Sequence, residues 1–364
     1  MERSSRLEVT GLTVVLGSEV VLADVSLRFR SGEIATILGS SGSGKTTLLR
    51  TIAGVQPWTS GAVELDDEPV RPGAVRMAMQ DDPLFEHLDV SGNLGFVQDL
   101  ERRPLAEREK TVRTTAQWMG IRRVLDHRPR QLSGGERAAA SVGRSITAIR
   151  KPFLLFDEPL ARADGRRRLA FFRRLRSIVG DPSRTPVGVV VATNEPEIVL
   201  PFSDRVVVMS GGRVLQWGSV EEVTDRPTTV EVAELATEPA MNLIPATLIG
   251  DGSTCGGDVL VVWTDRVVPN WSHRPLHGPV VLGIRPGEFR PASPGTPFQS
   301  VLHVCIGGFD IVNRIARFGL GATPGTVYAM ATAPGERYRR GDRIEITWSR
   351  YRIFRADTGE LVHD

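Results

Sequence analysis

Eight consecutive residues, Gly39 to Thr46, read GSSGSGKT and could hold a nucleotide phosphate. Glycines let successive backbone N–H groups curl around a phosphate, and the start of the following helix adds a partial positive charge. Lys45 would reach the β- and γ-phosphates, and the Thr46 hydroxyl would ligate Mg²⁺. A chance glycine-serine turn is the alternative, but the loop lies between a predicted strand and a predicted helix, which favours ATP binding. The expected nucleotide contacts are Gly39, Ser40, Ser41, Gly42, Ser43, Gly44, Lys45, Thr46 and Thr47.

A second segment, Phe153 to Pro159, reads FLLFDEP and places two carboxylates at the end of an apolar strand. A nucleotide-bound Mg²⁺ and its attacking water need such groups. Asp157 would hold the metal through water, and Glu158 would polarise the water that attacks the phosphate. Alone, an acidic strand end is commonplace on protein surfaces. Together with the phosphate loop, it predicts ATP hydrolysis.

Strands that alternate with helices must position these groups. Short buried strands are predicted immediately before the phosphate loop and before the acidic pair, which is typical of a parallel α/β sheet. A long arginine-rich stretch that is weak in β-formers predicts a helical subdomain. The predicted elements are strands within 7–30 and at Ile34–Leu38, Phe153–Phe156 and Val187–Ala192, a helix at Lys45–Ala53, and mostly helix over 95–150.

The pattern changes near residue 225. Asp225 to Pro245 holds three prolines and no long apolar run, which is typical of a linker or a domain edge. Short strands separated by Gly and Pro follow, and they predict a small all-β domain, a compact barrel. These strands carry the sequences VLVVW, PVVLGI, TVYAMA and DRIEITW.

Composition narrows the possible classes of protein. A length of 364 residues predicts two domains, and a formal net charge of +2 gives no global field that would attract nucleic acid. Cys255 and Cys305 match no metal-ligand spacing, and two isolated cysteines behind a polar, charged start predict a reduced compartment without a secretory leader. The basic run Gly165 to Arg176 could suggest nucleic-acid binding, but a helix with a solvated basic face explains it more simply.

A third motif, LSGGE at Leu132 to Glu136, makes the chain resemble the ATP-binding cassette (ABC) ATPases. Their signature is LSGGQ, and here Glu136 stands in the place of the glutamine. The resemblance implies that Ser133 and the amides of Gly134 and Gly135 cap a γ-phosphate. In that family the phosphate belongs to the other subunit, so the resemblance also implies two ATP molecules sandwiched in a dimer.

Other segments resemble the cassette in the same order. Gln80 takes the place of the glutamine that joins Mg²⁺ to the transporter-facing subdomain, and Asp164 fits a loop that crosses the dimer interface. TSG at Thr59 to Gly61 and DRVVVMSGGRV at Asp204 to Val214 also match. The implied fold is an α/β P-loop NTPase of ABC type over 1–235, with a helical subdomain at about 82–150.

The C-terminal part resembles the corresponding domain of sugar-importer ATPases of the maltose type, with relatives among polyamine, ferric-iron and sulfate importers. MNLIPA from Met241, LGIRP from Leu282 and FRADTGELV from Phe354 carry the likeness. Each motif also fits an ordinary strand end, and their order after a cassette is what favours the resemblance. It implies an OB-like domain over 236–364 that holds the dimer together and receives regulatory signals.

Two positions depart from the family pattern. The place of an aromatic residue that stacks on adenine falls on Leu16, so we expect weaker or less selective nucleotide binding. Where the family reads Thr-His-Asp after a buried strand, this chain reads ATNEPE, with Asn194 in the place of the histidine that touches the γ-phosphate. Asparagine donates one hydrogen bond but cannot take up a proton or carry a positive charge. The loss is mild if the histidine chiefly positions groups, and it is ~10²–10⁴ in rate if the charge or proton handling of the histidine matters.

The resemblance implies the ATP-hydrolysing subunit of an ABC importer, peripheral to the cytoplasmic face of the membrane. Implied partners are a second ATPase subunit, identical or different, two membrane permease subunits and a solute-binding protein, with no nucleic acid. The alternative is a nucleotide-binding regulatory or structural subunit with weak hydrolysis, because of Asn194 and Leu16. A cassette protein of DNA repair or translation is disfavoured, since the chain has one cassette and an importer-like β-domain.

Overall fold

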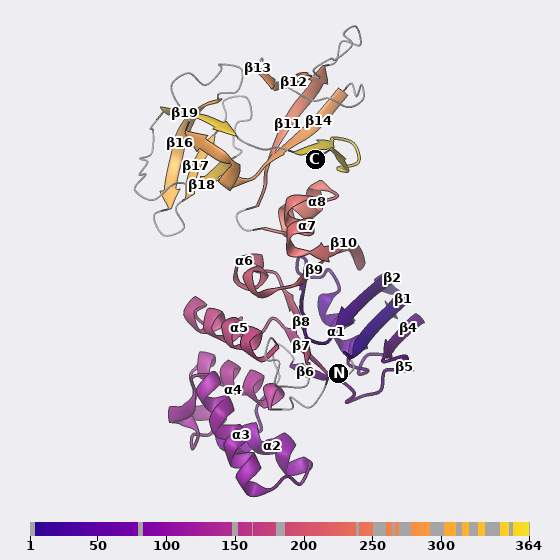
Figure 1. The fold of residues 1–364 in the computed structure, drawn as a ribbon, viewed down its shortest axis with the longest axis vertical. Coiled ribbons are helices and arrows are strands. Elements are labelled where there is room, and N and C mark those ends of the chain that lie inside the picture. Colours follow the sequence, from indigo (N-terminus) through magenta and orange to yellow (C-terminus); the bar gives the residue numbers. More distant parts are fainter. Residues whose placement is uncertain are drawn as a thin grey trace. The chain divides into compact units, whose positions relative to one another are not determined.

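A computed structural model describes most of the chain, and Figure 1 traces its path. The described residues are 4–78, 83–147, 152–161, 163–179, 186–237, 240–249, 260–263, 266–268, 278–291, 302–310, 315–319, 327–331, 343–348 and 352–363. The chain divides into two compact units, Met1–Val223 and Thr224–Asp364.

The first unit is built on a six-stranded sheet with the order β10-β9-β3-β8-β7-β6. All neighbours pair in parallel except β9 and β10. The central strands are continuous apolar runs, buried along their length, as expected for a parallel sheet covered on both faces. The bounds are β3 Ile34–Leu38, β6 Arg76–Ala78, β7 Phe153–Asp157, β8 Gly188–Thr193, β9 Arg205–Ser210 and β10 Arg213–Ser219.

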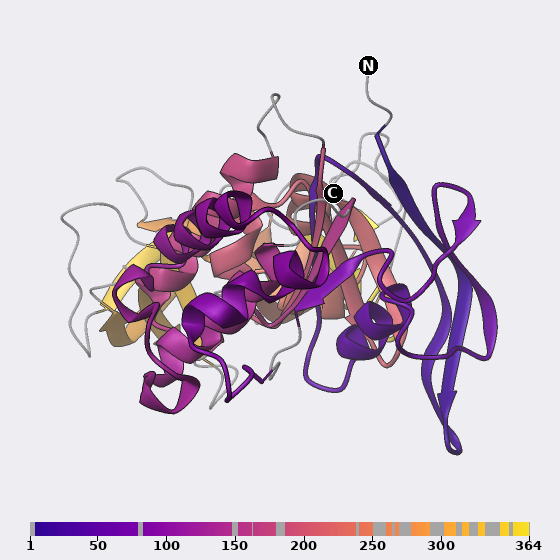
Figure 2. The same ribbon diagram turned by 90° about the horizontal axis from the view of Figure 1, so that it is seen from below.

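A four-stranded antiparallel sheet with the order β2-β1-β4-β5 packs against one side of the parallel sheet. Its first two strands alternate buried apolar and exposed side chains, so one face joins a core with helix α1 and the other faces solvent. In Figure 2 these indigo strands lie across the parallel strands from the magenta helices. The bounds are β1 Arg6–Leu16, β2 Glu19–Arg30, β4 Ser60–Leu65 and β5 Glu68–Pro69.

Helices cover the other side and form the subdomain expected at about 82–150. Helices α2, α3 and α4 pack on one another, and the second apolar core runs from them to α5 and the sheet. No helix among the described residues is both long and apolar enough to cross a membrane. The bounds are α1 Lys45–Ile52, α2 Val90–Leu100, α3 Leu105–Trp118, α4 Gly134–Ile146, α5 Gly165–Val179 and α6 Pro196–Val199, with 3₁₀ turns at Arg122–Val124, Pro129–Gln131 and Leu200–Phe202.

The described strands of the second unit form two antiparallel sheets, with orders β13-β12-β11-β14-β20-β21 and β15-β19-β16-β17-β18. The four strands expected from the sequence texture are present as β12, β14, β18 and β19. Closure into an OB-like barrel stays a prediction. The bounds are β11 Asn242–Ile249, β12 Leu260–Trp263, β13 Arg266–Val268, β14 Gly278–Ile284, β15 Phe289–Pro291, β16 Leu302–Asp310, β17 Ile315–Gly319, β18 Val327–Ala331, β19 Arg343–Trp348, β20 Arg352–Arg355 and β21 Leu361–His363.

Two ion pairs connect segments of this unit that are distant in the sequence. Arg352 donates to both carboxylate oxygens of Glu288 at 2.8 and 2.9 Å, and Arg285 pairs with Asp225. Arg285 belongs to the LGIRP motif, so one residue of that motif has a structural role here. Two short helices, α7 Val220–Asp225 and α8 Val230–Leu235, and a 3₁₀ turn at Pro286–Glu288 complete the described elements. The expected domain boundary at 235 therefore falls at the end of α8, inside the second unit.

Candidate functional site

Three strands end at the same level of the parallel sheet. Leu38, the last residue of β3, pairs with Thr193 at the end of β8, and Ala192 pairs with Asp157 at the end of β7. The residues that follow, Gly39, Asn194 and Glu158, therefore emerge side by side at the carboxyl edge. Ligands of open parallel sheets bind at this edge. The register thus brings together the phosphate loop, the acidic pair and Asn194, which we call the switch position.

The phosphate loop is shaped by close backbone approach. A Cβ atom on Gly39 would lie 2.4 Å from the Met209 carbonyl oxygen and 2.5 Å from the Ser43 hydroxyl, so only glycine fits there. Gly44 caps α1 with a φ of 97°, in the left-handed region that glycine adopts without strain. No side chain caps this helix start. Its first N–H groups therefore point into the loop, where they can bind an anion.

Lys45 lies inside this loop, with 6% of its surface exposed. Its ammonium donates to the carbonyl oxygens of Gly39 at 2.6 Å and Ser40 at 2.8 Å. Burial lowers the pKa of Lys45, and the nearby carboxylates of Glu158 and Asp157 act in the opposite direction. A buried cation whose charge is only partly balanced by nearby carboxylates attracts an anionic ligand. The phosphate contact of Lys45 stays a prediction from the sequence.

Behind the loop, Asp157 is 4% exposed and accepts a hydrogen bond from the Thr46 side chain. Burial raises the pKa of Asp157, while the hydrogen bond from Thr46 and the charges of Arg50 and Lys45 oppose that rise. A hydroxyl and a buried carboxylate in contact form a hard-oxygen donor set of the kind that Mg²⁺ takes. The third expected ligand, Gln80, lies outside the described residues.

Glu158 sits at a strained point of the backbone. Its φ is 45°, in the left-handed region that costs a non-glycine residue of order 1 kcal/mol or more. Its N–H donates to the Ala192 carbonyl oxygen at 2.9 Å, which fixes the turn against β8. Such strain persists where the surroundings over-determine it, and it aims the carboxylate toward the switch position.

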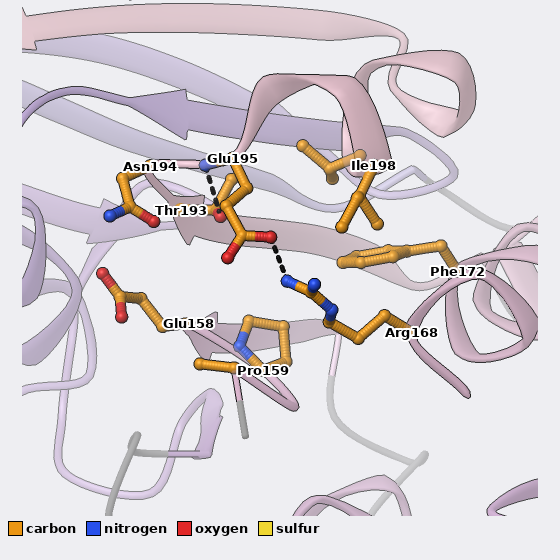
Figure 3. Close-up of a pocket in the computed structure, with 10 residues that line it drawn as sticks. Glu158, Pro159, Arg168, Phe172, Thr193, Asn194, Glu195 and Ile198 are labelled. Carbon is orange, nitrogen blue, oxygen red and sulfur yellow. Dashed lines mark hydrogen bonds and ion pairs between the residues drawn. The ribbon is translucent and has the colours of Figure 1, made fainter. Parts of the chain in front are cut away.

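A small open pocket is lined by Glu158 on one strand end and by Thr193, Asn194 and Glu195 after β8. Figure 3 shows the Glu158 and Asn194 side chains turned toward one another. Arg168 of α5 also lines the pocket and makes an ion pair with Glu195. The Glu195 N–H donates to the Thr193 hydroxyl at 3.1 Å. The site therefore includes an ion pair that the sequence analysis did not single out.

One signal in the sequence could have found Arg168. It stands four residues before Phe172 and seven before Leu175, both of which are buried, so helical spacing places it on the apolar face of α5. The other arginines of α5 are exposed, in agreement with the predicted solvated basic face, and Arg168 is the exception in this helix.

The LSGGE motif lies at the start of α4, away from the phosphate loop of the same chain. Ser133 is the N-cap, and its hydroxyl contacts the Glu136 carboxylate at 2.7 Å, while its N–H donates to that carboxylate at 3.0 Å. Hydrogen bonds from Ser133 lower the pKa of Glu136. Gly134 and Gly135 form the first turn. Within one chain, the structure does not bring these residues to the nucleotide loop.

Two further predicted residues occupy distinct places. Leu16 ends β1 and is 44% exposed, so its side chain is available for apolar contact with a ligand. Asp164 precedes α5, where its carboxylate accepts from the Arg167 N–H at 3.0 Å. Asp164 is exposed, as a residue at an interface between subunits would be in a separate chain.

Comparisons with known proteins agree with this geometry. The family model described as "ABC transporter" matches residues 22–161. The chain is 32% identical over 98% of its length to an sn-glycerol-3-phosphate import ATP-binding protein, UgpC 1, of Rhizobium johnstonii, and covers 96% of that protein. It is 30% identical over 95% of its length to the sulfoquinovosyl glycerol transport ATP-binding protein SmoE of Agrobacterium fabrum, again covering 96%.

Solved structures share the fold of the first unit. The ATP-binding cassette MJ0796, solved as a dimer in a post-hydrolysis state with ADP and Pi, superposes with a TM-score of 0.53 at 23% identity, over 58% of this chain and 98% of the other. CbiO1 of Clostridium perfringens, part of an ABC transporter complex, gives 0.53 at 24% identity, over 63% and 92%. The α/β P-loop fold expected from the sequence is confirmed.

Proposed function

Because this chain belongs to the ATP-binding proteins of ABC transporters, we propose that it is the subunit that hydrolyses ATP to drive import of a small solute. Relatives are named for import of sn-glycerol-3-phosphate and transport of sulfoquinovosyl glycerol. Both are glycerol derivatives that carry a negative charge. We extend that class of solute to this chain, with membrane subunits as the parts that select it.

The observation that carries the proposal is the shared level at which β3, β7 and β8 end. Because these strands end at one level, the phosphate loop, the Glu158 carboxylate and the Asn194 amide lie around one opening. In the proposed reaction the loop N–H groups and Lys45 bind the β- and γ-phosphates and stabilise the charge that develops as the terminal bond breaks. Glu158 accepts a hydrogen bond from the attacking water and orients it. Asn194 donates its amide N–H to the γ-phosphate.

The donor set fits Mg²⁺. The Thr46 hydroxyl and the Asp157 carboxylate are in contact, and the burial that raises the pKa of Asp157 leaves a carboxylate that a cation would stabilise. Thr46 and Asp157, with Gln80, would hold the ion, which supplies charge neutralisation at the phosphates when bound. Lys45 completes the positive side of the site from the loop.

A single chain lacks part of this proposed site. The start of α4, with Ser133 and Gly134, is the second anion-binding helix start, and it lies on a different element from the phosphate loop. A second ATPase subunit, as in the dimeric cassette with ADP and Pi, would supply it. Two permease subunits would hold the pair at the cytoplasmic face of the membrane, and a solute-binding protein would deliver the solute.

One observation favours a second candidate, a nucleotide-binding regulatory or structural subunit with little turnover. The Asn194 amide cannot act as an acid or a base near neutral pH and carries no charge, and its neighbours in the pocket are a carboxylate, Glu158, and an ion pair. If a cation at the switch position is required for hydrolysis, this chain binds ATP and depends on a different partner ATPase for turnover. Substitution of Asn194 by histidine separates the two candidates.

Substitution of Glu158 tests hydrolysis. We expect Glu158→Gln to lower kcat by ~10²–10⁴ while ATP still binds, because the amide keeps the shape but cannot act as a base. Glu68→Gln, at an exposed carboxylate of edge strand β5, is the matched control and keeps the wild-type rate. Steady-state phosphate release and ATP titration measure both effects. Equal turnover of wild type and Glu158→Gln would overturn the proposal.

A further inference from the structure

An ion pair beside the proposed site joins two elements that are distant in the sequence. Arg168 lies in the second turn of α5, and Glu195 is the residue just before α6. Their side chains are 20% and 38% exposed, so the pair is shielded from solvent on one side. Arg168 Nε is buried without a hydrogen-bond partner among the described residues. This arginine has given up water contacts to reach Glu195.

The pair acts on the segment that carries Asn194. Glu195 follows Asn194 directly, and its N–H is bound to the Thr193 hydroxyl at 3.1 Å on the other side. The segment is thus held at Thr193 by the end of β8 and at Glu195 by α5, with Asn194 between the two. Figure 3 shows Asn194 next to Glu195, whose carboxylate is paired with Arg168.

Charge gives the pair a second effect. Glu158 and Glu195 both line the pocket, and a triphosphate would add further negative charge at its mouth. Like charges that line one pocket repel each other. An unpaired Glu195 would repel both Glu158 and the phosphate, or would turn away and carry Asn194 with it. Arg168 of α5 neutralises the Glu195 carboxylate.

We propose that Arg168 is a positioning residue that acts through Asn194, because its ion pair with Glu195 fixes the segment after β8 with the Asn194 amide facing Glu158. The proposal rests on the proposed hydrolytic function. A neutral amide has only two N–H directions and no charge to attract a phosphate from a distance. Its orientation therefore decides whether it contributes, and a misplacement of about 1 Å can lower a rate ~10²-fold.

Arg168→Ala, tested in the full chain, separates positioning from a general structural role. We expect kcat to fall ~10-fold with KM changed less than ~2-fold, since the ground-state grip on the phosphates comes from the loop. The control is Arg176→Ala, which breaks the ion pair of Arg176 with Asp204 on the same helix. That control should leave kcat within ~2-fold of wild type.

A double-mutant cycle with Asn194→Ala identifies the residue through which Arg168 acts. In the Asn194→Ala background, Arg168→Ala should lower kcat less than ~2-fold further, because the group that it positions is gone. An equal loss in both backgrounds would show that Arg168 acts on something else. An Asn194→Ala variant with full turnover would also overturn the proposal, since there would be nothing to position.

Hydrogen exchange gives a readout that does not depend on turnover. Arg168→Ala should speed amide exchange in residues 193–199 while Arg176→Ala leaves that segment unchanged. Unchanged protection in Arg168→Ala contradicts the proposal even if the wild-type chain hydrolyses no ATP. Absence of wild-type hydrolysis, in contrast, overturns the proposed function. The two failures are therefore distinguishable.

Discussion

The phosphate loop and the segment after β8 leave neighbouring strands at the same level, yet they are held in different ways. Backbone geometry fixes the phosphate loop: Gly39 fits only without a side chain, and Lys45 is bound by loop carbonyl oxygens. The segment after β8, residues 193–199, is called the switch segment here. A side chain from α5 fixes it, through the ion pair of Glu195 with Arg168. The charges of the first are almost fully buried, whereas those of the second are partly exposed.

The two regions therefore have different roles: the phosphate loop binds the nucleotide, and the switch segment positions Asn194. A loop whose shape comes from backbone atoms, its own and those of β9, should tolerate side-chain changes elsewhere. A segment defined by a distant ion pair depends on two residues that are 27 positions apart. The phosphate loop should therefore respond to substitutions within itself, and the switch segment should respond to substitutions on α5.

The largest effect is expected at Gly39. In Gly39→Ala the new Cβ would meet the Met209 carbonyl oxygen at 2.4 Å and the Ser43 hydroxyl at 2.5 Å, and a carbonyl on a buried strand cannot easily move. We expect ATP affinity to fall at least ~100-fold and the free energy of unfolding to drop by about 1–3 kcal/mol. ATP titration and urea unfolding measure the two changes.

Gly287→Ala is the control, since nothing lies within 4 Å of its Cβ position. It should bind ATP as the wild type does. If Gly39→Ala kept wild-type affinity and stability, the phosphate loop would be as adaptable as the switch segment, and the comparison would fail.

A smaller effect, of opposite sign, is expected at the switch position. In Asn194→His the imidazole can carry a proton and a positive charge toward the phosphate, so we expect kcat to rise ~10-fold. The gain should depend on pH near the ordinary pKa of histidine, about 6.5. Asn194→Gln, which keeps an amide, is the control and should give no gain. Steady-state turnover between pH 5.5 and 8 measures both variants.

An unchanged rate in Asn194→His would indicate that the asparagine is a tolerated substitution. The second candidate, a subunit with little turnover, would then lose its support. A gain from a wild-type rate near zero would favour that candidate. A ~10-fold gain on a measurable wild-type rate would keep the hydrolysing subunit and place the weakness of the site in the switch segment rather than in the phosphate loop.

The sequence predicts those parts of the site whose residues are contiguous in the chain. The phosphate loop, the acidic pair and the capped start of α4 are continuous stretches, and the buried strands before them are short apolar runs, so one pass along the chain predicts them. The all-β character of the second unit followed in the same way from strands separated by Gly and Pro. The division into sheets could not be predicted, because strand order depends on pairing between distant segments.

The rest of the site depends on contacts between distant elements. Helical spacing places Arg168 on the same side of α5 as Phe172, but its ion-pair partner Glu195 comes from a segment 27 positions away. The left-handed φ of Glu158 has no signal in its residue type, since glycine or asparagine is the usual choice there. Both features arise when α5 and β8 pack against the end of β7, which the sequence does not reveal.

The smallest effect, on stability, concerns the buried charge behind the phosphate loop. Burial raises the pKa of Asp157 above its ordinary value of 3.8. A carboxyl whose pKa is higher in the folded chain stabilises the fold below the unfolded pKa, and that contribution is lost as pH rises through the folded pKa. At pH 7 the ionised, buried Asp157 is therefore destabilising in the nucleotide-free chain. Asp157→Asn removes that charge and keeps the shape.

We expect Asp157→Asn to raise the thermal midpoint of the nucleotide-free chain by about 2 °C at pH 7. The advantage should shrink as pH falls toward 3.8, because the wild-type carboxyl becomes protonated in both states. The same variant should lose Mg²⁺-dependent hydrolysis, since an amide is a poor ligand for the ion. A lower midpoint at pH 7, or an advantage that grew toward acid pH, would show that the hydrogen bond from Thr46 and the nearby cations outweigh burial. The phosphate-loop side would then gain stability from its buried charge, as the switch segment does from its ion pair.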